Sequence, residues 1–113
     1  MSEKVVLPKV TAVVVTYQSA GTLDALFVAA QRCRAAKVLE FVFVDNGSKD
    51  ATPHILAKQT DWADVVITGV NNGFGRGCNI GLDKVKTPYT LFLNPDAQIE
   101  PEAIETMVAF MDA

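Results

Sequence analysis

Three residues near the carboxyl end of the chain, Asn94-Pro95-Asp96, raise the first chemical question. They follow the apolar run YTLFL. Asn, Pro and Asp are favoured turn residues, so the triplet can simply close a strand. It can also place the carboxylate of Asp96 where chemistry occurs. The triplet alone favours the turn, and the choice depends on what other residues lie nearby.

Two further polar segments share this ambiguity. Asp45-Asn46-Gly47-Ser48 also follows an apolar run, and it can be a plain turn with Ser48 or Asp50 as a helix cap. The segment NNGFGRG, residues 71–77, can be a flexible glycine loop. Its glycines do not match the dinucleotide fingerprint GxGxxG, because Cys78 stands where the third glycine is needed. The P-loop sequence is absent as well, so a nicotinamide cofactor and a P-loop site are both disfavoured.

The polar segments are positioned by alternating strands and helices. Four short apolar runs predict strands that are buried on both faces of a parallel sheet, and segments with one apolar helical face separate them. The expected strands are residues 10–16, 39–44, 64–68 and 90–93, and the expected helices are residues 22–35, 52–59, 79–85 and 101–111. Thr52 and Pro53 suit a helix cap followed by proline at the first helical position.

This order predicts an α/β fold, a Rossmann-like parallel sheet with helices on both faces and strand order 3-2-1-4. Ligands of such sheets bind beyond the carboxyl ends of the strands, near the switch between strands 1 and 4. All four polar segments are therefore expected at one edge of the sheet, including Thr16-Tyr17-Gln18-Ser19 after strand 1.

Composition excludes several classes of function. The 113 residues are enough for one folded domain, and half of them are hydrophobic. A net charge of -3 without a basic run disfavours nucleic acid and anionic membranes as partners. Cys33, Cys78 and the one histidine, His54, are too scattered for a structural zinc site. The chain shows no signal peptide and no membrane-spanning run, and its thiols are expected to be reduced in the cytoplasm.

With these segments identified, the chain resembles the N-terminal, nucleotide-sugar-binding half of the family 2 glycosyltransferases, which have the GT-A fold. The matching segments are VVVTYQSAGTL, FVFVDNGSKDAT, NNGFGRGCNIGL and YTLFLNPDAQIEPEAI. They occur in the family's order over about residues 13–104. The resemblance implies that residues 1–113 form a single nucleotide-sugar-binding domain, a fragment of a longer GT-A enzyme.

The resemblance also implies roles for individual residues. Thr16 and Tyr17 would line the base pocket, largely through backbone atoms, and Asp45 would accept a hydrogen bond from N3–H of uracil or thymine. Asp96 would bind a divalent metal, Mg²⁺ or Mn²⁺, that bridges the pyrophosphate of the donor. The other nucleotide-binding residues implied in this way are Asn72, Gly73, Asn79 and Asn94. Arg76 is a further candidate cation, because glycines flank it.

The chain departs from the family pattern at two places. Asn94 occupies the first position of the family's DxD element, so one carboxylate is missing. No residue after Asp96 matches the acidic general base, and the half of the family that carries the acceptor site is absent. The catalytic base is therefore unknown and expected outside this chain. An apolar fourth strand at the sheet edge would invite another chain to pair with it, which predicts self-association or a chain cut from a longer protein.

The leading interpretation is an inverting, metal-dependent glycosyltransferase. It would move a sugar from a UDP- or dTDP-linked donor to a hydroxyl of a saccharide or lipid-linked acceptor, in the cytoplasm or at the inner face of the membrane. A non-catalytic module that binds nucleotide sugars is one alternative. A nucleotidyltransferase-like enzyme is another, but that class has a basic glycine-rich loop after strand 1, whereas TYQSAGTL has only Gly21 and no Arg or Lys.

Overall fold

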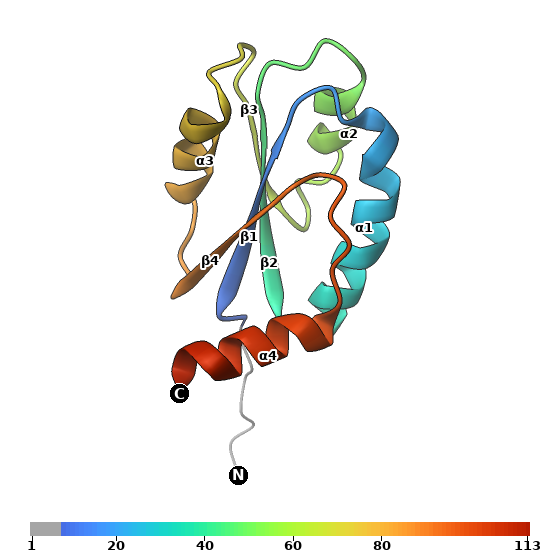
Figure 1. Ribbon diagram of the computed structural model, residues 1–113. Coiled ribbons are helices and arrows are strands. Elements are labelled where there is room, and N and C mark those ends of the chain that lie inside the picture. Colours follow the sequence, from blue (N-terminus) through green and yellow to red (C-terminus); the bar gives the residue numbers. More distant parts are fainter. Residues whose placement is uncertain (1–7) are drawn as a thin grey trace.

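The computed structural model describes residues 8–113. Strands and helices alternate strictly along these residues, as the sequence predicts (Figure 1). The elements are β1 (Val10–Thr16), α1 (Ala20–Ala35), β2 (Leu39–Asp45), α2 (Thr52–Ala57), β3 (Asp64–Ile67), α3 (Phe74–Leu82), β4 (Tyr89–Leu93) and α4 (Pro101–Asp112).

The four strands form one parallel sheet in the order β3-β2-β1-β4, which confirms the predicted topology. Thr16 at the end of β1 lies opposite Asp45 at the end of β2, and Asp45 lies opposite Ile67 at the end of β3. On the other side of β1, Val14 pairs with Leu93, the last residue of β4. The carboxyl ends of all four strands therefore meet at one edge of the sheet, called here the carboxyl edge.

Helices cover both faces of the sheet. Residues of α1, α2 and α4 pack with one face in a cluster that includes Leu23, Phe43, Leu56 and Ile104. The other face is covered by α3, which lies alone on the left of Figure 1. Both central strands are buried, with every residue of β1 and all but Glu40 of β2 shielded from solvent.

The prediction of strands buried on both faces is wrong for β3 and β4. All of their residues are partly covered or exposed. Among the described strands, each of these two has a neighbour on one side only, because they form the two edges of the sheet. No helix of residues 8–113 is both long enough and apolar enough to cross a membrane.

The largest difference in helix boundaries concerns α3, which begins at Phe74 and not at the predicted Asn79. Glycine lowers helix propensity, which is why the glycine-rich segment was expected to be a loop. Gly81 of α3 lies so close to the sheet that a Cβ there would be 2.4 Å from Cγ1 of Val13. Gly81, and likewise Gly77, whose Cβ would lie 2.9 Å from Cγ1 of Val15, are thus required for close packing of the helix on the sheet.

The start of α2 also differs from the prediction. The N-cap residue is Ala51, and Thr52 is the first helical residue. The hydroxyl of Thr52 instead accepts a hydrogen bond of 2.9 Å from the backbone N–H of Ser19. Thr52 therefore joins α2 to the loop after β1.

Candidate functional site

The carboxylate of Asp45 lies at the centre of the carboxyl edge. It is 1% exposed, and it accepts hydrogen bonds from the hydroxyl of Thr16 (2.9 Å), the hydroxyl of Ser48 (2.6 Å) and the backbone N–H of Ser48 (3.0 Å). Two of these bonds go to Oδ1 and one to Oδ2, so Oδ2 keeps one acceptor position. Asp45 therefore fixes the loop after β2 and retains capacity for one more donor.

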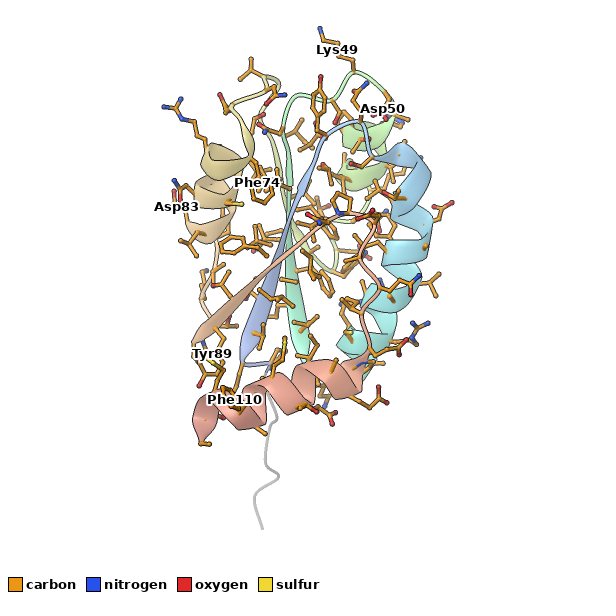
Figure 2. The ribbon with its side chains drawn as sticks, viewed as in Figure 1. Lys49, Asp50, Phe74, Asp83, Tyr89 and Phe110 are labelled. Carbon is orange, nitrogen blue, oxygen red and sulfur yellow. The ribbon has the colours of Figure 1, made fainter. Side chains whose placement is uncertain are left out.

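Gln18 links the loop after β1 to the loop after β2. Its backbone N–H donates to the hydroxyl of Ser48 (2.8 Å), and its side-chain Oε1 accepts from the backbone N–H groups of Lys49 and Asp50. Gln18 adopts a φ of 53°, which is uncommon for a residue other than glycine. Lys49 and Asp50 lie at the top of the molecule in Figure 2, in the loop that follows β2.

Asp50 holds the starts of two helices. Its carboxylate accepts hydrogen bonds from the backbone N–H of Thr52 in α2 (2.9 Å) and of Ala20 in α1 (3.4 Å). Hydrogen bonding with Thr52, first with its side chain and then with its backbone, lowers the pKa of the Asp50 carboxyl from its ordinary value. Of the two cap candidates in the sequence, Asp50 contacts the helix ends, whereas Ser48 binds Asp45.

Asn46 connects the loop after β2 to the loop after β3. Its side-chain Oδ1 accepts a hydrogen bond from the backbone N–H of Asn72 (2.9 Å), and its Nδ2 donates to the carbonyl of Gly73 (3.0 Å) and to Oδ1 of Asn71 (3.3 Å). Neither Asn46 nor Gln18 was predicted to have a role of its own. Both are polar residues directly after a strand, but their partners are distant in sequence and no local pattern identifies them.

The predicted nucleotide-binding residues are distributed over these loops. Thr16 is buried beneath the site, and the side chain of Tyr17 is 50% exposed. Asn72 is partly buried and Gly73 is exposed in the loop after β3. Asn79, expected near the ribose and pyrophosphate, is exposed within α3 and does not belong to the loop.

Residues Asn94 to Ala97 form a turn after β4, in which the N–H of Ala97 donates to the carbonyl of Asn94 (3.0 Å). The turn interpretation of this segment is therefore correct. Asp96 is nevertheless exposed, and Asn94 is exposed beside it. The segment Asn94 to Ala97 is therefore a turn that also leaves the carboxylate of Asp96 available to a ligand.

Asp96 lines a cavity of about 330 Å³ between α1, from Gly21 to Arg32, and the segment 95–100 that connects β4 to α4. Because α1 follows β1 and this segment follows β4, the cavity lies between the two connections that leave the switch between β1 and β4. Neither Asp45 nor the loop after β3 lines it. Asp45 and Asp96 lie at the same edge of the sheet but do not line the same cavity. The start of α1 adjoins both the cavity and the loop after β2. Within residues 8–113, no three His, Cys, Asp or Glu side chains gather as a preformed metal site.

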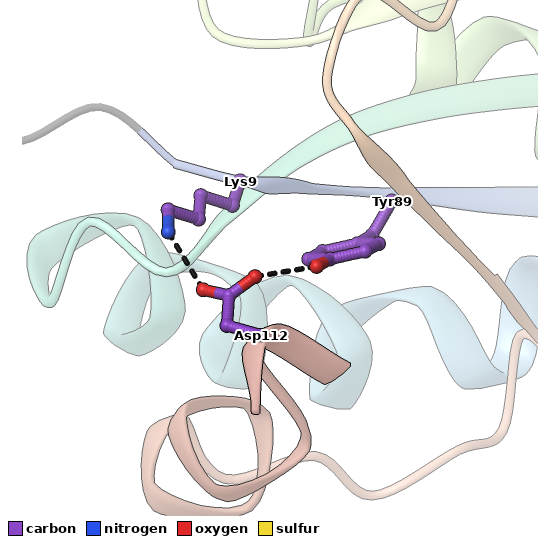
Figure 3. Close-up of polar contacts among 3 residues, drawn as sticks. All are labelled: Lys9, Tyr89 and Asp112. Atoms are coloured by element: carbon purple, nitrogen blue, oxygen red, sulfur yellow. Dashed lines mark hydrogen bonds and ion pairs between the residues drawn. The ribbon is translucent and has the colours of Figure 1, made fainter. Parts of the chain in front are cut away.

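Asp112 lies at the opposite end of the sheet. It forms an ion pair with Lys9 (2.7 Å) and accepts a hydrogen bond from the hydroxyl of Tyr89 (Figure 3). Lys9 precedes β1 and Tyr89 begins β4, so this cluster is at the amino ends of the strands. Its position excludes Asp112 as a base at the carboxyl edge.

A doubly wound parallel sheet with joined polar loops at its carboxyl edge defines the class of Rossmann-like α/β domains that bind nucleotides. The sequence model of glycosyl transferase family 2 matches residues 11–113. The chain therefore belongs to glycosyl transferase family 2, and its four-stranded sheet is a partial GT-A fold.

Among curated proteins, the chain is similar to the succinoglycan biosynthesis protein ExoO of Rhizobium meliloti (strain 1021). The two are 31% identical over 108 residues, which are 95% of this chain and 31% of ExoO. The chain thus spans about a third of the length of this relative.

Two solved structures show the same fold. TarS 1-349 of S. aureus matches with a TM-score of 0.77 and 26% identity, over 92% of this chain and 32% of TarS. The mannosyltransferase PcManGT of Pyrobaculum calidifontis, in complex with GDP-Man and Mn²⁺, matches with a TM-score of 0.80 and 20% identity. That match covers 95% of this chain and 33% of PcManGT.

Proposed function

We propose that this chain is the donor-binding part of an inverting, metal-dependent glycosyltransferase that uses a nucleoside-diphosphate sugar. The observation that carries the proposal is the hydrogen-bonded arrangement of three loops around Asp45, at the same edge as the exposed Asp96. TarS has been solved with UDP-GlcNAc, and PcManGT with GDP-Man and Mn²⁺. Family membership does not favour the nucleotidyltransferase-like alternative.

The bonding of Asp45 favours uracil or thymine as the base. One acceptor position on Oδ2 matches the single N3–H of these pyrimidines. Guanine presents two neighbouring donors on the equivalent edge, and the second would find no free acceptor on this carboxylate. Asp45 is 1% exposed, so binding of a base to Oδ2 requires a local rearrangement around the carboxylate.

The exposed carboxylate of Asp96 fits a divalent cation as a single protein ligand. Mg²⁺ commonly binds through one or two carboxylates, with phosphate oxygens and water as the other ligands. Asn94 adds an uncharged amide at the first position of the turn. Such an ion supplies charge neutralisation for the departing diphosphate, which a domain with a net charge of -3 otherwise lacks. Arg76 is exposed near the start of α3 and is a second candidate for this role.

In the proposed reaction, an acceptor hydroxyl of a saccharide or lipid-linked acceptor attacks the anomeric carbon in line. The bond to the diphosphate breaks as the new glycosidic bond forms, so the configuration inverts. We assign no residue of this chain as the base. Donor binding without sugar transfer is therefore the behaviour expected of residues 1–113 alone. A non-catalytic nucleotide-sugar module would behave in the same way, and only turnover by a longer form would distinguish the two.

Calorimetric titration with UDP, dTDP and GDP, with and without Mn²⁺, tests the proposal. UDP or dTDP should bind more tightly than GDP, and Mn²⁺ should strengthen binding. Asp96→Ala should remove the Mn²⁺ effect. Asp83→Ala is the matched control, because it removes one exposed carboxylate at the end of α3. Binding that is indifferent to both Mn²⁺ and Asp96 would contradict the metal assignment, and no binding would contradict the proposed function.

We further propose that the chain associates with a second copy through β4. This strand pairs only with β1 among the described strands. Tyr89 donates its N–H to Lys9, so the alternation along the strand directs the N–H groups of Thr90 and Phe92 outward. The side chain of Phe92 is 47% exposed. An edge with free backbone groups and an apolar side chain is able to pair with another strand.

We propose a cytoplasmic location because the two cysteines are not joined in a disulfide. Cys33 is buried and Cys78 partly buried, and both are free thiols. Free thiols are typical of reducing compartments.

A further inference from the structure

Asn46 is held at both its backbone and its side chain, and it belongs to none of the positions assigned above to the nucleotide. Its side chain is 3% exposed. Its backbone N–H donates to the carbonyl of Thr16 (2.9 Å), which extends the pairing of β1 with β2 by one residue. Its carboxamide then reaches across to Asn72 and Gly73. One residue thus connects the ends of β1 and β2 to the loop that precedes α3.

The contacts of Asn46 require a carboxamide. Oδ1 accepts from Asn72, while Nδ2 donates to two oxygens, those of Gly73 and Asn71. Aspartate has the same shape but no donor when ionised, and its carboxylate would face the same two oxygens. Alanine has neither donor nor acceptor, so partly buried polar groups of the loop would lose their partner.

The loops joined by Asn46 are also in direct backbone contact. Gly47 has a φ of +84°, and a Cβ there would lie 2.5 Å from the carbonyl carbon of Val70 and 2.6 Å from the nitrogen of Asn71. Gly73, with a φ of +83°, is the N-cap residue of α3. The short segment from Val70 to Gly73 is therefore fixed against the loop after β2, with Asn46 supplying its side-chain hydrogen bonds.

We propose that Asn46 is a positioning residue of the donor site. It holds Asn72 and Gly73 in place relative to Asp45. The part of the site assigned to the ribose and diphosphate therefore keeps a fixed position relative to the part assigned to the base. This inference rests on the proposed function, because that proposal assigns Asn72 and Gly73 to the nucleotide. Asn46 acts through these residues and need not touch the ligand.

Hydrogen exchange without nucleotide tests the contact itself. In Asn46→Ala and Asn46→Asp, the backbone N–H of Asn72 should exchange faster, while the N–H of Val14 in the centre of the sheet should exchange at the wild-type rate. Gln31→Glu is the matched control for the added charge, because Gln31 is exposed near the carboxyl end of α1. Unchanged exchange at Asn72 in both Asn46 variants would overturn the proposal.

A double-mutant cycle tests the positioning role. With UDP and Mn²⁺, Asn46→Asp should weaken binding by roughly tenfold or more, the loss expected when a buried hydrogen-bond partner is removed. If Asn46 acts by placing Asn72, the same substitution made on top of Asn72→Ala should cost much less. A merely structural role would give additive losses, and additive losses would overturn the proposal.

The controls separate the outcomes. The midpoint of urea unfolding is measured for every variant, and Asn46→Ser, which keeps a hydroxyl donor and acceptor, replaces any variant that does not fold. If wild-type protein fails to bind UDP, the proposed function fails and the positioning role fails with it. If wild-type protein binds but Asn46→Asp binds equally well, only the positioning role is overturned.

Discussion

Asp45 shows how one buried carboxylate can organise a site at the residue scale. The hydroxyls of Thr16 and Ser48 and the backbone N–H of Ser48 all donate to it. A buried polar group without a hydrogen-bond partner destabilises the folded state. The carboxylate therefore stabilises its donors, and the donors stabilise the carboxylate. The end of β1 and the loop after β2 therefore keep their relative position through one side chain.

Asp45→Ala should lower the free energy of unfolding by about 2–3 kcal/mol, because it leaves buried donors without an acceptor. Urea denaturation measures this loss. Asp24→Ala, on the exposed surface of α1, should change stability by only about 0.5 kcal/mol or less. Equal losses in the two variants would show that the buried hydrogen bonds of Asp45 contribute nothing specific.

Sequence reasoning placed Asp45 and Asp96 at strand ends correctly, because a change from apolar to polar residues is a local signal. It missed Asn46, since the partners of its side chain lie 25 to 27 positions away in the sequence. It missed Gln18 for the same reason, and a positive φ at glutamine has no local sequence signal. Residues that carry hydrogen bonds between loops become visible only when the loops are in place.

At the scale of elements, the packing of α3 on the sheet depends on small residues. Gly81→Ala should destabilise the protein by about 1–3 kcal/mol, because its Cβ would meet Val13 and Val44 of the sheet. Gly75→Ala is the matched control in the same helix, where a Cβ would meet no atom within 4 Å. Thermal unfolding should show a lower midpoint for the Gly81 variant alone, and a tolerated Gly81→Ala would contradict the close packing of α3.

The cluster of Lys9, Tyr89 and Asp112 should make the attachment of α4 depend on pH. The hydrogen bond from Lys9, followed by that from Tyr89, lowers the pKa of Asp112 from 3.8, and Asp112 raises the pKa values of Lys9 from 10.5 and Tyr89 from 10.0. A lowered carboxyl pKa stabilises the fold above 3.8, and this contribution is lost as the pH falls through the folded value. The raised pKa values stabilise the fold below about 10, and their contribution is lost as the pH rises through the folded values.

A carboxyl NMR titration checks the acid side of this prediction. The titration midpoint of Asp112 should lie below 3.8 in the wild-type protein and move upward in Lys9→Met. This substitution removes the hydrogen bond that lowers the pKa of Asp112 the most. An identical midpoint in both proteins would show that Lys9 and Asp112 do not interact in solution.

The elements themselves were largely predictable from the sequence. The apolar runs identified all four strands. Right-handed crossovers restricted the possible topologies, and the commonest doubly wound arrangement among them has the observed strand order. The start of α3 was not predictable, because the low helix propensity of its glycines is outweighed by their close contact with Val13 and Val15. The partial exposure of β3 and β4 results from their position at the edges of the sheet. Their apolar composition alone did not indicate it.

At the scale of the whole molecule, several exposed apolar side chains lie on β4 and α4. Phe110 and Met111 of α4 are 79% and 59% exposed, and a cavity of about 600 Å³ lies between α4 and the start of β4. Figure 2 shows Phe110 and Tyr89 near each other at the end of the molecule opposite the loop with Lys49. Association through the β4 edge would leave the carboxyl edge free for a ligand.

Sedimentation velocity over a wide range of concentration tests this association. The wild-type chain should dimerise as its concentration rises, and Phe92→Lys should remain monomeric because a charge on an edge strand opposes pairing. Val28→Lys is the matched control, since Val28 is 61% exposed on α1 and away from β4. A wild-type chain that stays monomeric throughout would contradict the proposed self-association.

The central claim is that the loops after the four strands form one site for a nucleoside diphosphate. An amide NMR titration of the wild-type chain with UDP and Mn²⁺ tests it most directly. The account predicts shifts at Tyr17, in the segments 45–48 and 71–73, and near Asp96, with Lys9 and Asp112 unchanged. Shifts confined to the end of the sheet where Lys9 and Asp112 lie, or no shifts at all, would contradict it.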